Sequence, residues 1–311
     1  MKLVVFAIFL SMSFSAFTQE RFITIDSTKI WINTIGIENR IEDQPVIVFE
    51  SGHGTPMGHW NRILNGVSEL APLITYDRPG IGESEADNEM PTIKNVSDKL
   101  IKVLKKLDIE PPYVLVGHSL GGAYVRGFAV YNPELLAGLI IIDPADFTET
   151  KLNRRTPFLD VGLTNEQVDT LFRKWETEDE ENKNRPTTKP KSVIEESEVL
   201  AQLRETDFVE ISDTELPNIP VHILTGGRYD TPPRFRIQEL NDSLLFRAKM
   251  KNRVERWTDV VQSVDKGMLF YSGDAGHFVH YDDPELLISS IRIVLHDYNL
   301  LKEKDQNTTN H

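Results

Sequence analysis

VLVGHSLGGA, residues 114–123, is an apolar run that ends at a serine framed by glycines and continues into a second apolar segment with helical spacing. A chain that turns from strand to helix in so few residues must hold the middle residue in a strained backbone conformation. Gly117 and Gly121 remove the side chains that would collide there, two residues before and two after Ser119. The pattern predicts a sharp turn that presents the Ser119 hydroxyl at the end of a strand and at the N-terminus of a helix, where exposed amides stabilise negative charge.

Short, continuous apolar runs recur on both sides of this turn, and segments with helical spacing separate them. Such runs are typical of strands buried on both faces of a parallel sheet. The runs expected to form strands are residues 46–49, 73–76, 113–116, 138–142, 221–224 and 268–271. Residues 23–34 instead alternate polar with apolar side chains around Asp26-Ser27, which predicts an edge hairpin. The alternation of strands with helices predicts an α/β fold with a mostly parallel, doubly wound sheet.

Residues 147–216 break this alternation, because they contain no strand-like run and carry a higher density of charge. Residues 176–181, ETEDEE, together with the following residues 182–191, NKNRPTTKPK, are predicted to form a solvated, mobile loop between segments of helical character. We therefore expect a helical cap inserted at the carboxyl end of a strand, over the crevice where open α/β sheets bind ligands. The sheet-forming core then comprises residues 19–146 and 217–300, and residues 301–311 form a polar, flexible tail.

Composition and the N-terminus bear on partners and compartment. The 311 residues carry a formal net charge of −14, which disfavours nucleic acids and anionic membranes as partners, and the absence of cysteine excludes disulfides and thiol nucleophiles. In residues 1–18, Lys2 precedes an apolar run and then small and hydroxylated residues, the layout of a secretory signal peptide. We expect cleavage near Thr18/Gln19, a secreted or periplasmic protein and no stable membrane insertion afterwards; an uncleaved anchor is the alternative.

Three passages of the chain resemble the α/β-hydrolase family, and the resemblance extends over about residues 22–297. Gly117–Gly121 is similar to the family's G-x-S-x-G nucleophile turn. Phe49–Gly54, followed by Trp60, is similar to its loop after the third strand, and residues 76–84, YDRPGIGES, to its turn after the fourth, which is mainly structural. The resemblance implies an α/β-hydrolase fold with about eight strands and a helical cap, and a serine hydrolase of the capped esterase or proline iminopeptidase-like branch.

A serine hydroxyl is a weak nucleophile at neutral pH and needs a neighbouring base. The resemblance places the catalytic histidine on the loop after the last strand, where this chain reads GDAGHFVH from Gly273 to His280. We favour His277 over His280, because the helix that follows would carry His280 away from the site.

The base needs a carboxylate that orients it and stabilises its cation. Asp230 follows the predicted strand 221–224 and a glycine turn, which is the usual place of this acid in the family. The chain order Ser119, Asp230, His277 also agrees with the family. Asp143, at the end of the predicted strand 138–142, is the alternative acid.

The oxyanion of the reaction needs two hydrogen-bond donors. The resemblance assigns one to the backbone amide of Leu120, directly after the nucleophile. The other comes from the loop after the predicted strand 46–49, where alignment on Trp60 gives the amide of His53. Reading His53-Gly54-Thr55-Pro56 as H-G-x-P gives Thr55 instead, and Ser51, which stands where the family usually has histidine, leaves this register open.

The expected activity is hydrolysis of carboxylic esters of small to medium, partly apolar substrates through an acyl-enzyme, without a metal or organic cofactor. Serine at position 119 disfavours the dehalogenase and epoxide-hydrolase branches, which by resemblance use aspartate there. The alternatives are an aminopeptidase or amidase of the proline iminopeptidase type, whose H-G-G-P-G loop is absent here, and a ligand-binding protein that kept the fold without catalysis.

Overall fold

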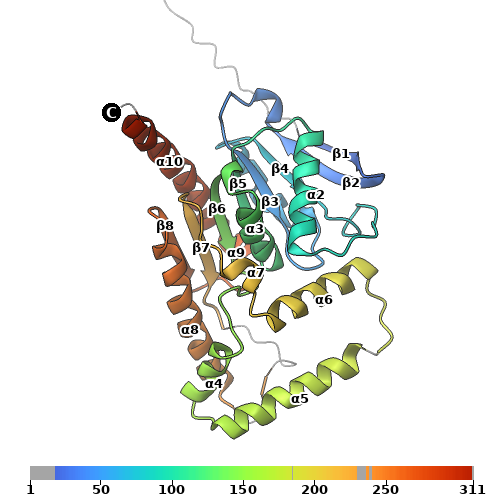
Figure 1. Cartoon of the computed structure of the whole chain (residues 1–311), viewed down its shortest axis with the longest axis vertical. Helices are drawn as coiled ribbons and strands as arrows, with labels where there is room; N and C mark the ends of the chain where they lie inside the picture. The colour runs from blue at the N-terminus through green and yellow to red at the C-terminus, as the bar shows by residue number, and fades with distance from the viewer. Residues whose placement is uncertain (1–17, 184, 230–235, 238–239, 310–311) are drawn as a thin grey trace, which may run out of the picture.

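The computed structural model describes residues 18–183, 185–229, 236–237 and 240–309 (Figure 1). Eight strands of this part of the chain form one sheet in the order β1-β2-β4-β3-β5-β6-β7-β8. The strands are β1 (Thr18–Ile25), β2 (Thr28–Ile35), β3 (Val46–Glu50), β4 (Leu73–Tyr76), β5 (Tyr113–His118), β6 (Leu136–Ile142), β7 (Val221–Gly226) and β8 (Gly267–Ser272). β1 and β2 form the antiparallel edge hairpin, and β3 to β8 run parallel. The predicted α/β fold with a mostly parallel sheet is confirmed.

Helices cover both faces of the sheet, as Figure 1 shows. α2 (Ile93–Lys106), α3 (Leu120–Tyr131) and α8 (Asp242–Gln262) pack on one face, and α1 (Asn61–Ser68), α9 (Val279–Asp282) and α10 (Pro284–Thr309) on the other. Successive side chains of a strand point to opposite faces. In β5, Leu115 therefore packs in the core beneath α2, α3 and α8, and Val114 and Val116 pack in the core beneath α1, α9 and α10. Because both faces are covered, the central strands read as continuous apolar runs.

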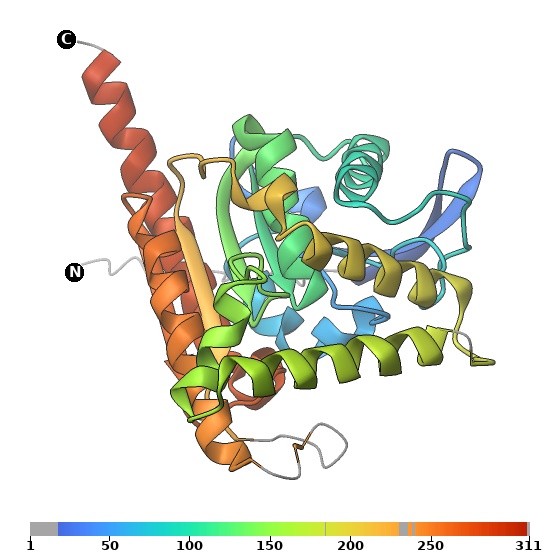
Figure 2. The same ribbon diagram turned by 60° about the horizontal axis from the view of Figure 1, so that its bottom comes forward.

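The described part of the segment between β6 and β7 contains no strand, and its helices are α4 (Thr156–Asp160), α5 (Asn165–Lys183), α6 (Lys191–Glu205) and α7 (Val209–Ser212). Figure 1 shows α6 nearer to the sheet and α5 further from it, and Figure 2 shows both helices running across the same side of the molecule. α6 joins the main core through Val199 and Leu203. α4, α5 and α8 form a small core of their own, with Phe158, Phe172 and Leu245 buried in it.

Two segments predicted to be irregular are helical instead. Residues 176–181, expected as a loop, belong to α5, and residues 301–309 of the expected flexible tail continue α10. Glutamate and lysine are good helix formers, and neither segment contains glycine or proline. Charge alone therefore did not end either helix.

The predicted signal peptide covers residues 1–18, of which residues 1–17 lie outside the described residues, and Thr18 begins β1. Within the described residues, no helix is both long enough and apolar enough to cross a membrane.

Candidate active site

Ser119 lies at the turn between β5 and α3 with φ 55° and ψ −117°, a backbone conformation that L-residues rarely adopt. The flanking glycines allow the chain to pack this closely. A Cβ atom at position 117 would lie 2.4 Å from the Gly121 carbonyl oxygen, and one at position 121 would lie 2.2 Å from the Glu50 carbonyl oxygen. The strained turn that the sequence predicts is therefore present, and it depends on both glycines.

The backbone of Ser119 is tied to the turn that follows β6. Its amide donates to the Ile142 carbonyl at 2.9 Å, and its carbonyl accepts from the Ala145 amide at 2.9 Å. Asp143 lies between these two anchors with φ 37°, in the left-handed region. The fold thus places a buried carboxylate in the turn beside the serine.

His277 follows β8, and its Nδ1 lies 2.5 Å from Oδ2 of Asp143. The other oxygen, Oδ1, accepts from the Thr225 hydroxyl at 2.8 Å, and an Arg253 guanidinium nitrogen lies 3.8 Å from it. Burial by itself would raise the pKa of Asp143. The hydrogen bond from His277 and the charge of Arg253 outweigh burial and hold that pKa below its usual value. Asp143 is thus an anionic partner for the ring of His277.

The structure therefore pairs His277 with Asp143, the alternative acid, whereas the sequence favoured Asp230, which lies outside the described residues. The turn after β6 is tied to the Ser119 backbone through the Ile142 carbonyl and the Ala145 amide, and it brings Asp143 within reach of the His277 ring. The sheet order does not by itself select Asp143, because β7 and not β6 lies beside β8, the strand before His277.

His118, the residue before Ser119, contacts the loop that carries His277. Its Nε2 lies 3.0 Å from the His277 carbonyl oxygen, and the two rings lie 4.7 Å apart between centroids. Burial, and then the neighbouring His277 and His280, lower the pKa of His118 well below its usual value. The ring is therefore neutral and must carry its proton on Nε2 to donate to that carbonyl. The sequence motif leaves this position variable and gave no signal of the role.

The hydroxyl of Ser119 and the ring of His277, both within the described residues, form no hydrogen bond with each other. The His277 side chain is 47% exposed. In enzymes without substrate, catalytic hydrogen bonds are often long or poorly aligned and tighten when substrate binds.

His280, the other histidine of this loop, is 1% exposed and packs against Trp60 at 4.5 Å between ring centroids. Burial lowers its pKa to about 3. A histidine packed in the interior with so low a pKa is unsuited to take a proton from the Ser119 hydroxyl. The geometry favours His277 as the base.

The candidate oxyanion donors differ in availability. The Thr55 amide already donates to the Gly52 carbonyl at 3.2 Å, whereas no described group accepts from the His53 amide. A Cβ atom at position 52 would lie 3.3 Å from Cβ of Ser119, so this loop passes directly beside the serine. Leu120 is the first residue of α3, and the first amides of a helix have no partner within it. The structure thus favours the amides of His53 and Leu120 over that of Thr55.

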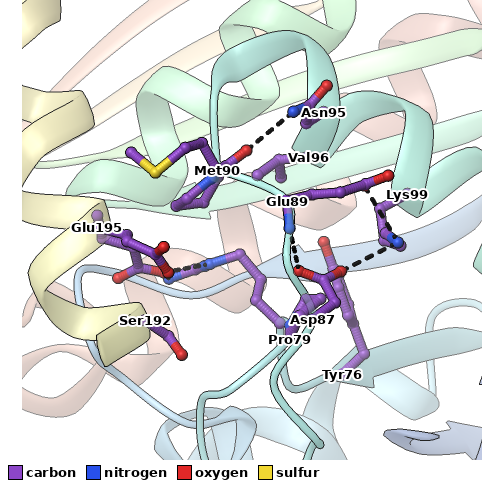
Figure 3. Close-up of a pocket in the computed structure, with 13 residues that line it drawn as sticks. Tyr76, Pro79, Asp87, Glu89, Met90, Asn95, Val96, Lys99, Ser192 and Glu195 are labelled. Atoms are coloured by element: carbon purple, nitrogen blue, oxygen red, sulfur yellow. Dashed lines mark hydrogen bonds and ion pairs between the residues drawn. The ribbon is translucent and has the colours of Figure 1, made fainter. Parts of the chain in front are cut away.

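A pocket lined by 13 residues lies between α6, the start of α2 and the segment that precedes α2 (Figure 3). Its volume is about 30 Å³, which is room for water only. Lys99 forms ion pairs in its wall with Asp87 at 3.1 Å and Glu89 at 3.3 Å. The lining includes neither Ser119 nor His277, so this pocket is separate from the candidate catalytic residues. No group of acidic, histidine or cysteine side chains suited to a metal ion is found within the described residues.

Comparisons with known proteins agree with this architecture. The sequence pattern described as "Alpha/beta hydrolase family" matches residues 47–289. An uncharacterized protein YqjL of Bacillus subtilis is 34% identical over 99 residues, which are 32% of this chain and 39% of that protein. The (lyso)-N-acylphosphatidylethanolamine lipase of Mus musculus is 28% identical over 125 residues, 39% of this chain and 36% of the lipase. The matched stretches thus span less than half the length of either relative.

Among solved structures, the epoxide hydrolase CorEH superposes with a TM-score of 0.57 at 16% identity, covering 91% of this chain and 99% of that chain. At this identity the likeness concerns the fold alone.

Proposed function

Because the chain belongs to the alpha/beta hydrolase family, we propose that it is a serine hydrolase that cleaves carboxylic esters of small to medium, partly apolar substrates. The observation that carries the proposal is the pairing of His277 with the buried Asp143, in the turn that also anchors the backbone of the strained Ser119. A lipase among the relatives supports an ester as the substrate. Serine at position 119 argues against the epoxide-hydrolase chemistry of the structural neighbour.

The proposed reaction begins with attack of the Ser119 hydroxyl oxygen on the substrate carbonyl. Nδ1 of His277 is engaged by Asp143, so Nε2 accepts the serine proton, and Asp143 stabilises the resulting imidazolium. The amides of His53 and Leu120 donate to the tetrahedral oxyanion. The C–O bond to the alcohol then breaks, and the alcohol takes the proton from His277. Water, activated by the same histidine, attacks the acyl-enzyme and releases the carboxylic acid.

Substitution of the nucleophile tests the proposal. Wild-type protein should hydrolyse p-nitrophenyl esters of graded chain length and react with a fluorophosphonate probe at Ser119. Ser119→Ala should lose both properties while circular dichroism and the melting temperature stay unchanged, because only one oxygen atom is removed. Faster cleavage of aminoacyl arylamides than of esters would favour an aminopeptidase. A folded wild-type protein without labelling or turnover would favour a ligand-binding protein.

We also propose that residues 1–18 are a signal peptide and that the mature protein is secreted or periplasmic, on the strength of Lys2 and the apolar run behind it. Mass spectrometry of the protein recovered from cell fractions tests this. A mature N-terminus at or near Gln19 in the periplasm or medium is the expected result, and an intact Met1 on a cytoplasmic protein would contradict it.

A further inference from the structure

One buried arginine binds the backbone of the loop that carries the His53 amide. Arg78 is 3% exposed, and its Nη1 donates to the Ser51 carbonyl at 2.6 Å and to Glu50 at 2.5 Å. Its Nη2 donates to the Gly52 carbonyl at 2.7 Å. The planar guanidinium therefore fixes two successive carbonyls of the loop directly before His53, a task that suits its rigid fork of donors.

The remaining donors of this arginine point to the cap. Nε of Arg78 donates to Oε1 of Glu196 at 2.8 Å, and Nη2 lies 2.7 Å from the same oxygen. Glu196 comes from α6 and is 1% exposed. With Glu196 in place, all five N–H groups of the guanidinium have acceptors.

The second oxygen of Glu196 reaches the oxyanion loop itself. Oε2 accepts from the Gly54 amide at 2.7 Å, directly after His53. The ring of His53 also contacts α6, with Nε2 3.0 Å from the Val193 carbonyl oxygen and 2.8 Å from the Ser197 hydroxyl. The His53 amide is thus flanked on both sides by backbone groups whose positions depend on one carboxylate of the cap.

Glu196 has no obvious structural reason to be buried other than these contacts. Glu50 already pairs with Arg78 in the core, and the Tyr76 hydroxyl donates to Glu50. A second buried carboxylate adds the cost of removing another charge from water. That cost is offset by the bonds to Arg78 and to the Gly54 amide, which join the cap to the loop beside Ser119.

We propose that Glu196 is a positioning residue for the oxyanion hole, and that the His53 amide is correctly placed only when α6 is seated on Arg78 and Gly54. The inference rests on the proposed serine hydrolase function. The cap would then act on catalysis itself, in addition to enclosing the substrate. An oxyanion donor that is displaced weakens the transition state more than the bound substrate, so the effect should fall on kcat.

Glu196→Gln tests the proposal, because the carboxamide has one acceptor for two donors and must turn its NH2 group toward either Arg78 or Gly54. We expect kcat on a p-nitrophenyl ester to fall by about 10- to 100-fold with KM changed by less than about threefold, given that loss of a whole oxyanion donor costs about 100- to 1000-fold. The affinity for a trifluoromethyl ketone, which forms a tetrahedral oxyanion on Ser119, should fall by the same factor as kcat/KM.

The matched control is Glu198→Gln, at an exposed position of the same helix, which should leave all three quantities unchanged. Where Glu196→Gln does not fold, Glu196→Asp carries the test. It keeps the charge against Arg78, but its shorter side chain cannot also reach Gly54, so a smaller loss in the same quantities is expected. Rates are expressed per fluorophosphonate-titrated site, so that only folded enzyme is counted.

The two ways of failing are distinct. Wild-type protein that neither reacts with fluorophosphonate nor turns over esters would contradict the proposed function. Wild-type protein that does both, with a Glu196 variant of unchanged kcat and ketone affinity, would overturn the positioning role alone.

Discussion

Asp143 has both carboxylate oxygens engaged, one by the His277 ring and the other by the Thr225 hydroxyl. In Asp143→Asn, an amide nitrogen would face the ring and favour the wrong histidine tautomer. We expect kcat on a p-nitrophenyl ester to fall by about 10⁴-fold, with the fold unchanged by circular dichroism. Asp230→Asn is the matched control and should change kcat by less than about threefold. If Asp230→Asn is the crippling substitution, the acid follows β7 and the pairing with Asp143 is not catalytic.

The candidate site residues differ in how well they can be predicted from the sequence. Ser119 lies in a glycine-framed turn that the neighbouring residues reveal, whereas His277 was placed through the resemblance of its loop to the histidine loop of the family. The choice between Asp143 and Asp230 depends on which of two turns reaches the His277 ring, and no local sequence pattern encodes that long-range contact. Glu196 could not be found at all, since it stands between Glu195 and Glu198 on a charged helix and only its packing on Arg78 distinguishes it.

The turn between β5 and α3 can form only because the backbone packs closely at Gly117 and Gly121, which have no side chains. Gly121→Ala would place a methyl group 2.2 Å from the Glu50 carbonyl and 2.6 Å from the Ser51 carbonyl, at the base of the oxyanion loop. We expect the free energy of unfolding in urea to fall by about 2 to 3 kcal/mol, with a loss of esterase activity in the remaining folded protein. Gly273→Ala, where nothing lies within 4 Å, is the control. Equal stability of the two variants would show that the turn relaxes easily.

Elements were predictable where periodicity and packing agree. All six apolar runs are strands. Burial on both faces explains the apolar residues of β3 to β7, whereas β8, at the edge of the sheet, is only half-buried. α5 and α10 extend further than the sequence analysis predicts, because a run of charged or polar residues does not by itself end a helix. The exposed face of a helix can carry charged residues at most of its positions. A high density of charge therefore indicates that a segment is exposed to solvent, but it does not indicate whether the segment is a helix or a loop.

The stability of the whole molecule should depend on pH through a histidine remote from the catalytic loop. His222 in β7 is fully buried, its Nδ1 lies 2.8 Å from the Ser290 hydroxyl, and burial lowers its pKa to about 4. Between the unfolded pKa of about 6.5 and this value the unfolded chain binds more protons, so stability falls as pH falls. The contribution of His222 to the loss between pH 7 and pH 5 should be about 2 kcal/mol, in addition to the contributions of the buried His118 and His280.

Urea unfolding at pH 7 and pH 5 measures this loss. His222→Gln should lose about 2 kcal/mol less than wild type between the two pH values, since it removes the group that titrates. His296→Gln, at an exposed position, should behave like wild type. The same acid loss in His222→Gln as in wild type would place the pH dependence elsewhere.

The cap leaves the core directly after the turn that bears Asp143, and that turn is fastened to α8 by the hydrogen bonds of Arg256 to Asp146 and, at 3.0 Å, to Thr148. A chimera that borrows a foreign cap to change selectivity must therefore be spliced beyond Thr148. Under the proposed mechanism, a junction before Asp143 would exchange the carboxylate that pairs with His277 together with the cap. On the proposed mechanism, the turn after β6, where the cap begins, therefore supports the reaction itself and does not select the substrate.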